Sequence, residues 1–261
     1  MFRRLLLVLA LASSAACSPS LDARELVRLD IVDRDTGQVL PGYPHRGQQW
    51  IAGAPGHRYS VRLANISGER VLVVLSVDGV NAVTGQTASP SQGGYVLEPW
   101  ETADIAGWRK SLDDIAQFVF TDLPDSYAAR TGRPDNVGVV GIAVFGERRP
   151  VYSQPDPPPP VAMDRAQSKA AAPAASADGM AAREAMPQRL GTGHGQREWA
   201  PVGQTEFVRA SRQPRQVSQV RYDDADALVA MGILPRPYWP RPQGTPRAFP
   251  VGFVPDPPYA R

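Results

Sequence analysis

The feature that most constrains the fold is the run RVLVVLSV at 70–77. It is β-branched and almost continuously apolar, which is typical of a strand buried on both faces. Asp78-Gly79 follows directly, before a second apolar stretch at 80–83. Asp-Gly between apolar runs favours a tight hairpin turn, because both positions tolerate a positive φ. The sequence therefore predicts a β-hairpin over 70–83.

Other segments repeat the strand pattern on both sides of this hairpin. At 27–31 and 59–63, apolar residues alternate with polar ones, which is the period of a half-buried strand. Further strands are expected at 94–97, 101–108, 117–121 and 137–145. Short strands separated by turns predict an all-β fold. We expect an antiparallel β-sandwich, immunoglobulin-like or jelly-roll-like, over residues 26–149.

Turns and short helices are expected between these strands. Residues 33–37 (DRDTG) resemble the start of a calcium loop but lack a third acidic ligand and the distal glutamate, so a hairpin turn explains them better. Residues 111–114 have the spacing of a capping box. Residues 126–131 precede Gly132 and Pro134, a typical helix end. Two small helical turns are therefore predicted.

The N-terminus has the three parts of a secretory signal peptide. Arg3 and Arg4 provide a basic start, residues 5–12 are uninterrupted apolar residues, and residues 13–16 are all small. The apolar run is too short for a stable membrane span. We therefore expect residues 1–16 to direct export from a bacterial cytoplasm.

Cys17, the only cysteine, follows directly. An unpaired thiol cannot form an internal disulfide and is a liability in an oxidising compartment. The segment 14–17 resembles the end of a bacterial lipoprotein signal, although Ser14 stands where leucine is usual. The resemblance implies a lipid on Cys17, a tether at 17–25 and, from Ser18, anchoring to the outer membrane in the periplasm. The alternative is an ordinary cut after Ala16 without a lipid.

Charge limits the classes of partner. The formal charge is +2, and removal of Arg3 and Arg4 with the signal brings it close to zero. Basic and acidic residues alternate, as in 28–30 and 33–35, instead of forming the basic surface that nucleic-acid binding needs. After the signal, no apolar segment approaches the length of a spanning helix. A nucleic-acid partner is therefore not expected.

The composition changes after residue 149. Prolines at 155–160 and the Ala/Ser/Pro stretch 170–177 offer little surface to bury, which predicts a disordered linker over 150–190. A loose helix at 170–186 is the alternative, because of its alanines. The tail 235–261 is rich in proline and contains aromatic residues. We expect it to be disordered, with a docking ligand of polyproline type as the alternative.

Residues 191–234 are expected to form a short β-β-α segment. LGTGHG at 190–195 is interpreted as a flexible turn, with strands at 205–210 and 216–222. Asp223-Asp224 then caps a helix over 225–231 that ends at Gly232. Two strands and one helix bury too little surface to be stable alone. The segment should therefore dock on the sandwich, adding strands at a sheet edge.

Four strings resemble an uncharacterised group of exported proteobacterial proteins. They are residues 57–85, 107–111 (GWRKS), 125–145 and 190–202. The similarity covers the sandwich and the LGTGHG segment, but neither the linker nor the tail. It implies no activity and no functional residues. The recurrence of LGTGHG favours docking of the C-terminal segment.

The sequence has few candidates for chemistry. Its histidines are His45, His57 and His194, without a pair at metal-ligand spacing. His57 is expected at a solvent-facing strand position, and His194 is a candidate loop base. There is no nucleophile elbow or phosphate-binding loop, and LGTGHG does not follow a strand, as a dinucleotide site would require. No metal or cofactor is therefore predicted.

Two function classes stay open. Asp78, Asp104, Asp122 and Asp125 lie near predicted strand ends and, with His194, are the candidates for a hydrolase of an envelope polymer. Aspartate is also the ordinary residue of turns and caps. The leading interpretation is a non-catalytic, lipid-anchored envelope module that binds a protein or a glycan.

One aromatic patch is the candidate binding site of that module. Trp100 and Trp108, with Arg109 and Lys110, predict an exposed patch for stacking on a sugar or binding a protein. The alternative is one core tryptophan beside a solvated strand end, and the sequence favours neither.

Overall fold

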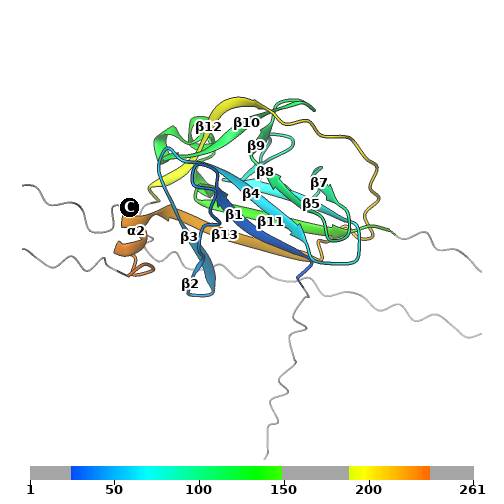
Figure 1. Cartoon of the computed structure of the whole chain (residues 1–261), viewed down its shortest axis with the longest axis horizontal. Helices are drawn as coiled ribbons and strands as arrows, with labels where there is room; N and C mark the ends of the chain where they lie inside the picture. Colours follow the sequence, from blue (N-terminus) through cyan, green and yellow to red (C-terminus); the bar gives the residue numbers. More distant parts are fainter. Residues whose placement is uncertain (1–24, 149–187, 236–261) are drawn as a thin grey trace, which may run out of the picture.

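The computed structural model describes residues 25–148 and 188–235 (Figure 1). The signal peptide, Cys17, most of the predicted linker and the proline-rich tail lie outside the described residues. The strands are β1 (Val27–Asp33), β2 (Tyr43–His45), β3 (Gln48–Gly53), β4 (Arg58–Asn65), β5 (Val71–Val77), β6 (Val80–Asn81), β7 (Tyr95–Leu97), β8 (Thr102–Ile105), β9 (Gly107–Arg109), β10 (Asp114–Asp122), β11 (Val139–Gly146), β12 (Leu190–Trp199) and β13 (Gln216–Asp224). The helical elements are η1 (Leu123–Asp125), α1 (Tyr127–Arg130), η2 (Pro134–Asn136) and α2 (Ala225–Ala230).

These strands form two sheets around one core. Sheet A has the order β1-β4-β10-β12, with β8 beside β4 and β9 beside β10. Sheet B has the order β2-β3-β13-β11-β5-β6, with β7 beside β5. All pairs are antiparallel except β13 with β3. The all-β sandwich expected from the sequence is confirmed, with a mixed sheet B.

The hairpin predicted from Asp78-Gly79 is present between β5 and β6. Both turn residues have positive φ values, 51° for Asp78 and 73° for Gly79, as the tight turn requires. β5 is buried on both faces. Its odd-numbered residues lie in the main core. On the other face, Leu72 and Val74 pack in a second cluster with Phe145. The continuous apolar run therefore has a physical basis in burial on both sides.

The C-terminal segment docks on the sandwich, as expected, but more deeply than at an edge. β12 extends sheet A beside β10. β13 lies inside sheet B, between β3 and β11. Tyr222 of β13 and Leu190 of β12 are almost fully buried in the core. Sheet B is therefore continuous only when the segment after the linker is in place.

Three local predictions were wrong. LGTGHG is not a flexible turn but the first part of β12. Residues 205–210 do not form a strand, and only Arg209 makes an isolated bridge, to Glu147. Residues 111–114 form no helical turn, because the Ser111 hydroxyl accepts the N–H groups of residues 113 and 114 in a tight bend. The helices that begin after Ser126 and Asp224 are confirmed, and each cap side chain accepts a backbone N–H.

The glycines of LGTGHG are required by close packing. A Cβ on Gly191 would lie 2.5 Å from Ser126 Cβ and 2.8 Å from Val137 Cγ1. A Cβ on Gly195 would lie 2.7 Å from Val119 Cγ2. Contacts shorter than about 3 Å force the neighbouring atoms to move, and a packed interior resists such movement. These glycines allow β12 to approach its neighbours.

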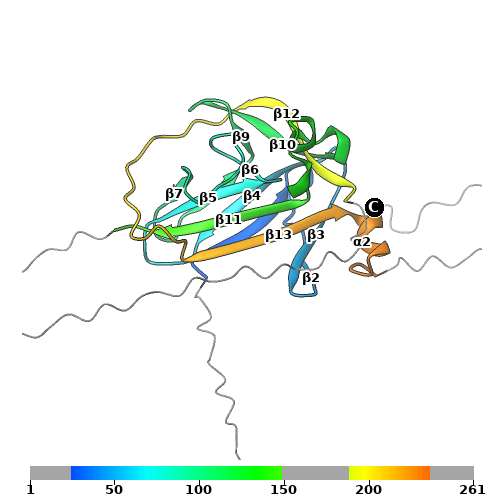
Figure 2. The ribbon, with the colours of Figure 1, turned by 180° about the vertical axis from the view of Figure 1, so that it is seen from behind.

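Two segments project from the sandwich. The connection between β12 and β13 bows outward as an arch at the end of the molecule far from α2 (Figures 1 and 2). The β2–β3 hairpin projects from another side. None of the helices in the described part of the chain is long and apolar enough to cross a membrane.

Candidate functional site

A large cavity lies where the two sheets expose free edges. Among the described residues, β7 pairs with β5 alone and β8 pairs with β4 alone. Residues of both strands line a cleft of about 1170 Å³. Residues 200–206, which we call the strap, line it from the β12–β13 connection. We call this cavity the strap cleft. Its volume lies somewhat above the usual range for ligand pockets, about 300–1,000 Å³.

The strap is held at its two ends. At one end, Ala200 N–H donates to the Asp113 carbonyl (2.7 Å) and Val202 N–H donates to the Leu112 carbonyl (2.8 Å). At the other end, Arg70 donates to the Thr205 hydroxyl (2.6 Å) and to the carbonyl of residue 206 (3.1 Å). Residues 201–206 are all exposed. Within the described residues, no backbone hydrogen bond joins the strap to β7 or β8. The strap therefore crosses the open side of the sandwich without closing it.

Two polar groups in the wall of the cleft have no hydrogen-bond partner within the described residues. They are the Tyr95 hydroxyl and the Arg109 Nε, and both atoms are shielded from solvent. Burial raises the pKa of the Tyr95 phenol, and the nearby Arg109 guanidinium offsets part of this rise, although the hydroxyl makes no hydrogen bond of acceptable geometry. Another nitrogen of Arg109, Nη1, donates to the Ala200 carbonyl of the strap. An unsatisfied buried polar group costs about 1–3 kcal/mol, so these two groups reduce the stability of the cleft wall.

The charges of the cleft are distributed unevenly. Arg109 and the exposed Lys110 lie together at the β9 end, and neither has an acidic partner among the described residues. In contrast, Asp104 is bound by Arg62 through two hydrogen bonds of 2.8 Å. The Glu101 carboxylate accepts the N–H of Glu98 (2.7 Å). The β9 end of the cleft is therefore a place where a ligand carboxylate would find two uncompensated cations.

The structure separates the residues of the predicted aromatic patch. Trp108 is 3% exposed, and its ring packs edge-on against Phe118 with centroids 4.8 Å apart. Trp100 is 68% exposed in the connection between β7 and β8, with a φ of 65°. Of the four residues of this patch, only Arg109 and Lys110 line the strap cleft. Trp108 thus belongs to the core, and the two tryptophans do not form one surface with the cations.

The proposed catalytic carboxylates and His194 occupy different surroundings. Of these five residues, only Asp104 lines the strap cleft. Asp122 and Asp125 are exposed at the end of β10 and in η1. His194 is exposed on β12, with its ring 5.7 Å from that of Tyr127.

Asp78 lies inside the molecule and is fully buried. Its carboxylate accepts hydrogen bonds from Gly138 N–H (3.0 Å), Thr192 N–H (2.7 Å) and the Tyr222 hydroxyl (2.6 Å). The Thr192 hydroxyl also bonds to Tyr59 (2.6 Å) and Tyr222 (2.7 Å). Burial raises the pKa of Asp78 to about 6, although these hydrogen bonds oppose the rise. This network joins the two sheets from within and is not accessible to a substrate.

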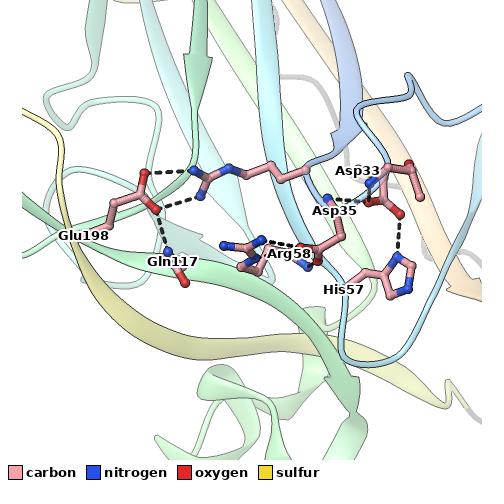
Figure 3. A network of polar contacts seen from close by, with 8 residues as sticks. Asp33, Asp35, His57, Arg58, Gln117 and Glu198 are labelled. Carbon is pink, nitrogen blue, oxygen red and sulfur yellow. Dashed lines mark hydrogen bonds and ion pairs between the residues drawn. The ribbon is translucent and has the colours of Figure 1, made fainter.

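A second polar network lies on the surface of sheet A (Figure 3). The Asp33 carboxylate accepts the N–H groups of Asp35 (2.9 Å) and Thr36 (3.0 Å), which confirms the hairpin-turn interpretation of residues 33–37. His57 is not simply solvated, because its Nδ1 lies 2.7 Å from Asp33 Oδ2. Burial opposes ionisation of Asp33, but His57 and the two N–H groups lower its pKa overall. The same contact raises the pKa of His57.

This network connects two parts of the chain that are far apart in the sequence. Carboxylate oxygens of Asp33 and Asp35 and a ring nitrogen of His57 are potential metal ligands and lie within 4.8 Å of one another. Arg58, however, forms an ion pair with Asp35. Beside them, Arg34 donates two hydrogen bonds, of 2.8 and 2.9 Å, to Glu198 of β12. These contacts fasten the N-terminal turn to the strand that follows the linker.

Comparison with known proteins gave no match to a protein-family model, a curated protein or a solved structure. The strap cleft is therefore identified as a candidate site from its geometry alone. Sequence reasoning identified Arg109 but missed Tyr95 and the strap. The sequence contains no pattern that predicts the strap. Pro201 and Gly203 indicate only that this part of the chain is not a regular strand.

Proposed function

We propose that this protein is a non-catalytic binding module of the bacterial cell envelope. In this proposal it is exported, anchored to the outer membrane through a lipid on Cys17, and holds an envelope protein or glycan in the strap cleft. The observation that carries the proposal is the cleft between two free sheet edges, with uncompensated cations at Arg109 and Lys110.

The state of the acidic groups supports binding over hydrolysis. Acid–base catalysis of a glycosidic bond uses two carboxyl groups facing one substrate, about 5–10 Å apart. Asp104 is neutralised by Arg62 and Glu101 caps the backbone at Glu98. The remaining candidate carboxylates do not line the cleft, and Glu206, the third acidic residue that lines it, lies on the exposed strap. The cleft thus offers donors and strand edges to a ligand, which is the chemistry of recognition.

Cross-linking inside cells tests the binding site. A photoreactive phenylalanine analogue replaces Gln204, an exposed strap residue that lines the cleft. The control position is Val217, which is 70% exposed on β13 and does not line the strap cleft. We expect an adduct at position 204 that is lost in Lys110→Glu and absent at position 217. Adducts that form at position 217 but not at 204 would show that the cleft is not the binding site.

Fractionation tests the anchor. Membranes are isolated from cells that express the wild type or Cys17→Ala, and the intact mass of the membrane-bound protein is measured. We expect a lipid-sized mass increase that disappears in the variant, together with release from the membrane. An unmodified, soluble wild-type chain beginning at Cys17 would overturn the anchor, but not the binding site.

A further inference from the structure

We infer that the ligand of the strap cleft is an extended polypeptide that carries a carboxylate and pairs with a free strand edge in the cleft. This inference rests on the proposed binding function and names the class of ligand. It follows from three properties of the cleft: unpaired backbone on its walls, unpaired cations at one end and a strap that leaves the passage open.

The backbone of the walls favours a polypeptide. An edge strand presents a row of N–H and C=O groups that a further strand can pair with. β7 and β8 each have one partner strand among the described residues, and both line the cleft. A chain that lies along either edge gains main-chain hydrogen bonds, the usual mode of peptide recognition by strand addition. A glycan lacks the regular alternation of amide donors and acceptors that such pairing uses.

The side chains of the walls fit an extended peptide with alternating residues. Val96 of β7 and Ile105 of β8 line the cleft together with polar residues such as Thr84. In an extended peptide, successive side chains point to opposite sides. One set of peptide side chains can therefore contact the apolar wall while the other faces solvent beneath the strap.

The charge at the β9 end sets the orientation. Arg109 and Lys110 have no acidic partner among the described residues, while Asp104 is already paired with Arg62. A carboxylate placed at this end is attracted by two cations. Hydrogen bonds to charged groups contribute about 1.5–3 kcal/mol. Acidic side chains or a chain terminus would both supply this group.

The strap leaves the backbone of the cleft walls free to pair with a ligand. Its ends are anchored at Leu112–Asp113 and at Arg70. Between these anchors, residues 203 and 204 make no backbone hydrogen bond to the walls within the described residues. A peptide lying beneath the strap therefore needs to displace no existing strand pairing, which would otherwise reduce its affinity.

Fluorescence anisotropy with purified protein carrying residues 18–261 tests the inference. The probe is a labelled octapeptide of alternating valine and glutamate. One comparison peptide has lysine in place of glutamate, and another has a methyl group on every backbone nitrogen. Polygalacturonate, an acidic glycan, is tested as a competitor. Lys110→Glu is the cleft variant, and Arg212→Glu, an exposed residue of the 211–215 loop, is its charge-matched control.

The expected result is saturable binding of the valine–glutamate peptide. The N-methylated peptide should bind at least about tenfold more weakly, because the loss of two or more hydrogen bonds, each worth about 1 kcal/mol, exceeds the roughly 1.4 kcal/mol that corresponds to tenfold in affinity. Lys110→Glu should weaken binding about fivefold or more, and Arg212→Glu should leave it unchanged.

Two results would overturn the inference. Equal binding of the methylated and unmethylated peptides would exclude strand pairing. The second result is that polygalacturonate displaces the labelled peptide at a lower concentration than the unlabelled peptide does, and that Lys110→Glu weakens polygalacturonate binding. The ligand would then be a glycan and not a polypeptide, and the proposed binding function would still hold. If no probe binds and position 204 forms no adduct in cells, both the inference and the proposed function fail.

Discussion

The Tyr222 hydroxyl donates a hydrogen bond of 2.6 Å to the buried carboxylate of Asp78. Asp78 belongs to the β5–β6 turn, and Tyr222 to the strand that completes sheet B after the linker. Thr192 of β12 binds both residues. One carboxylate therefore contacts both strands of the C-terminal segment and ties them to the first part of the chain.

Loss of this contact should destabilise the fold. Tyr222→Phe removes the hydroxyl and leaves the ring, so the change is confined to the hydrogen bonds. A hydrogen bond to a charged group is worth about 1.5–3 kcal/mol, and we expect the free energy of unfolding to fall by about 2 kcal/mol in urea titrations at pH 7. Tyr43→Phe, on the projecting β2–β3 hairpin, is the matched control and should change stability by less than about 0.5 kcal/mol. Equal effects of the two substitutions would contradict the role of the network.

Asp78 should also make stability depend on pH in an unusual direction. Its pKa is about 6 in the folded protein against an ordinary value of 3.8, so the folded state binds more protons than the unfolded state between these values. Stability from this group is therefore highest below about pH 4 and falls as the pH rises to about 6, by about 3 kcal/mol in total.

The measurement is the free energy of unfolding of the wild type and Asp78→Asn across pH 4–8. The difference between the two proteins isolates Asp78 from the surface carboxylates. It should shift in favour of the variant as the pH rises and become constant above about pH 7. A difference that does not change with pH would show that Asp78 has an ordinary pKa.

The contact between His57 and Asp33 predicts a pH dependence of the same sign at higher pH. The pKa of His57 is raised by Asp33, so its stabilising contribution is present below pH 6.5 and is lost as the pH rises through the folded pKa. The titration of His57 followed by NMR should have its midpoint above 6.5. In Asp33→Asn the midpoint should return towards that value. An unchanged midpoint in the variant would mean that the contact does not form in solution.

Local sequence signals predicted the elements that depend on side-chain pattern. β5 was predictable because it is buried on both faces, and α2 because Asp224 caps it and Gly232, with a φ of 72°, ends it. β12 was missed because its glycines carry no side chains and therefore show no periodicity. Its strand conformation comes from pairing with β10, which no local pattern reveals.

Pairing between segments far apart in the sequence was the other feature that the sequence did not predict. The strand at 216–222 was recognised, but its parallel pairing with β3 inside sheet B joins segments far apart in the sequence. The strap cleft depends on the same placement, because the connection between β12 and β13 forms the strap. Trp108 illustrates the difficulty on a smaller scale: its residue type fitted both a surface patch and the core, and only packing against Phe118 decides between them.

The glycines of β12 provide the sharpest test of how the C-terminal segment docks. Gly191→Ala places a methyl group 2.5 Å from the Cβ of Ser126, the residue that caps α1. Overpacking of this kind typically costs about 1–3 kcal/mol, and we expect a loss of about 2 kcal/mol in urea unfolding. Gly203→Ala in the strap is the matched control, because its Cβ would meet nothing within 4 Å. Its stability should stay equal or rise slightly, since alanine restricts the unfolded chain. If Gly191→Ala were as stable as Gly203→Ala, β12 would not pack against the Ser126 turn in solution.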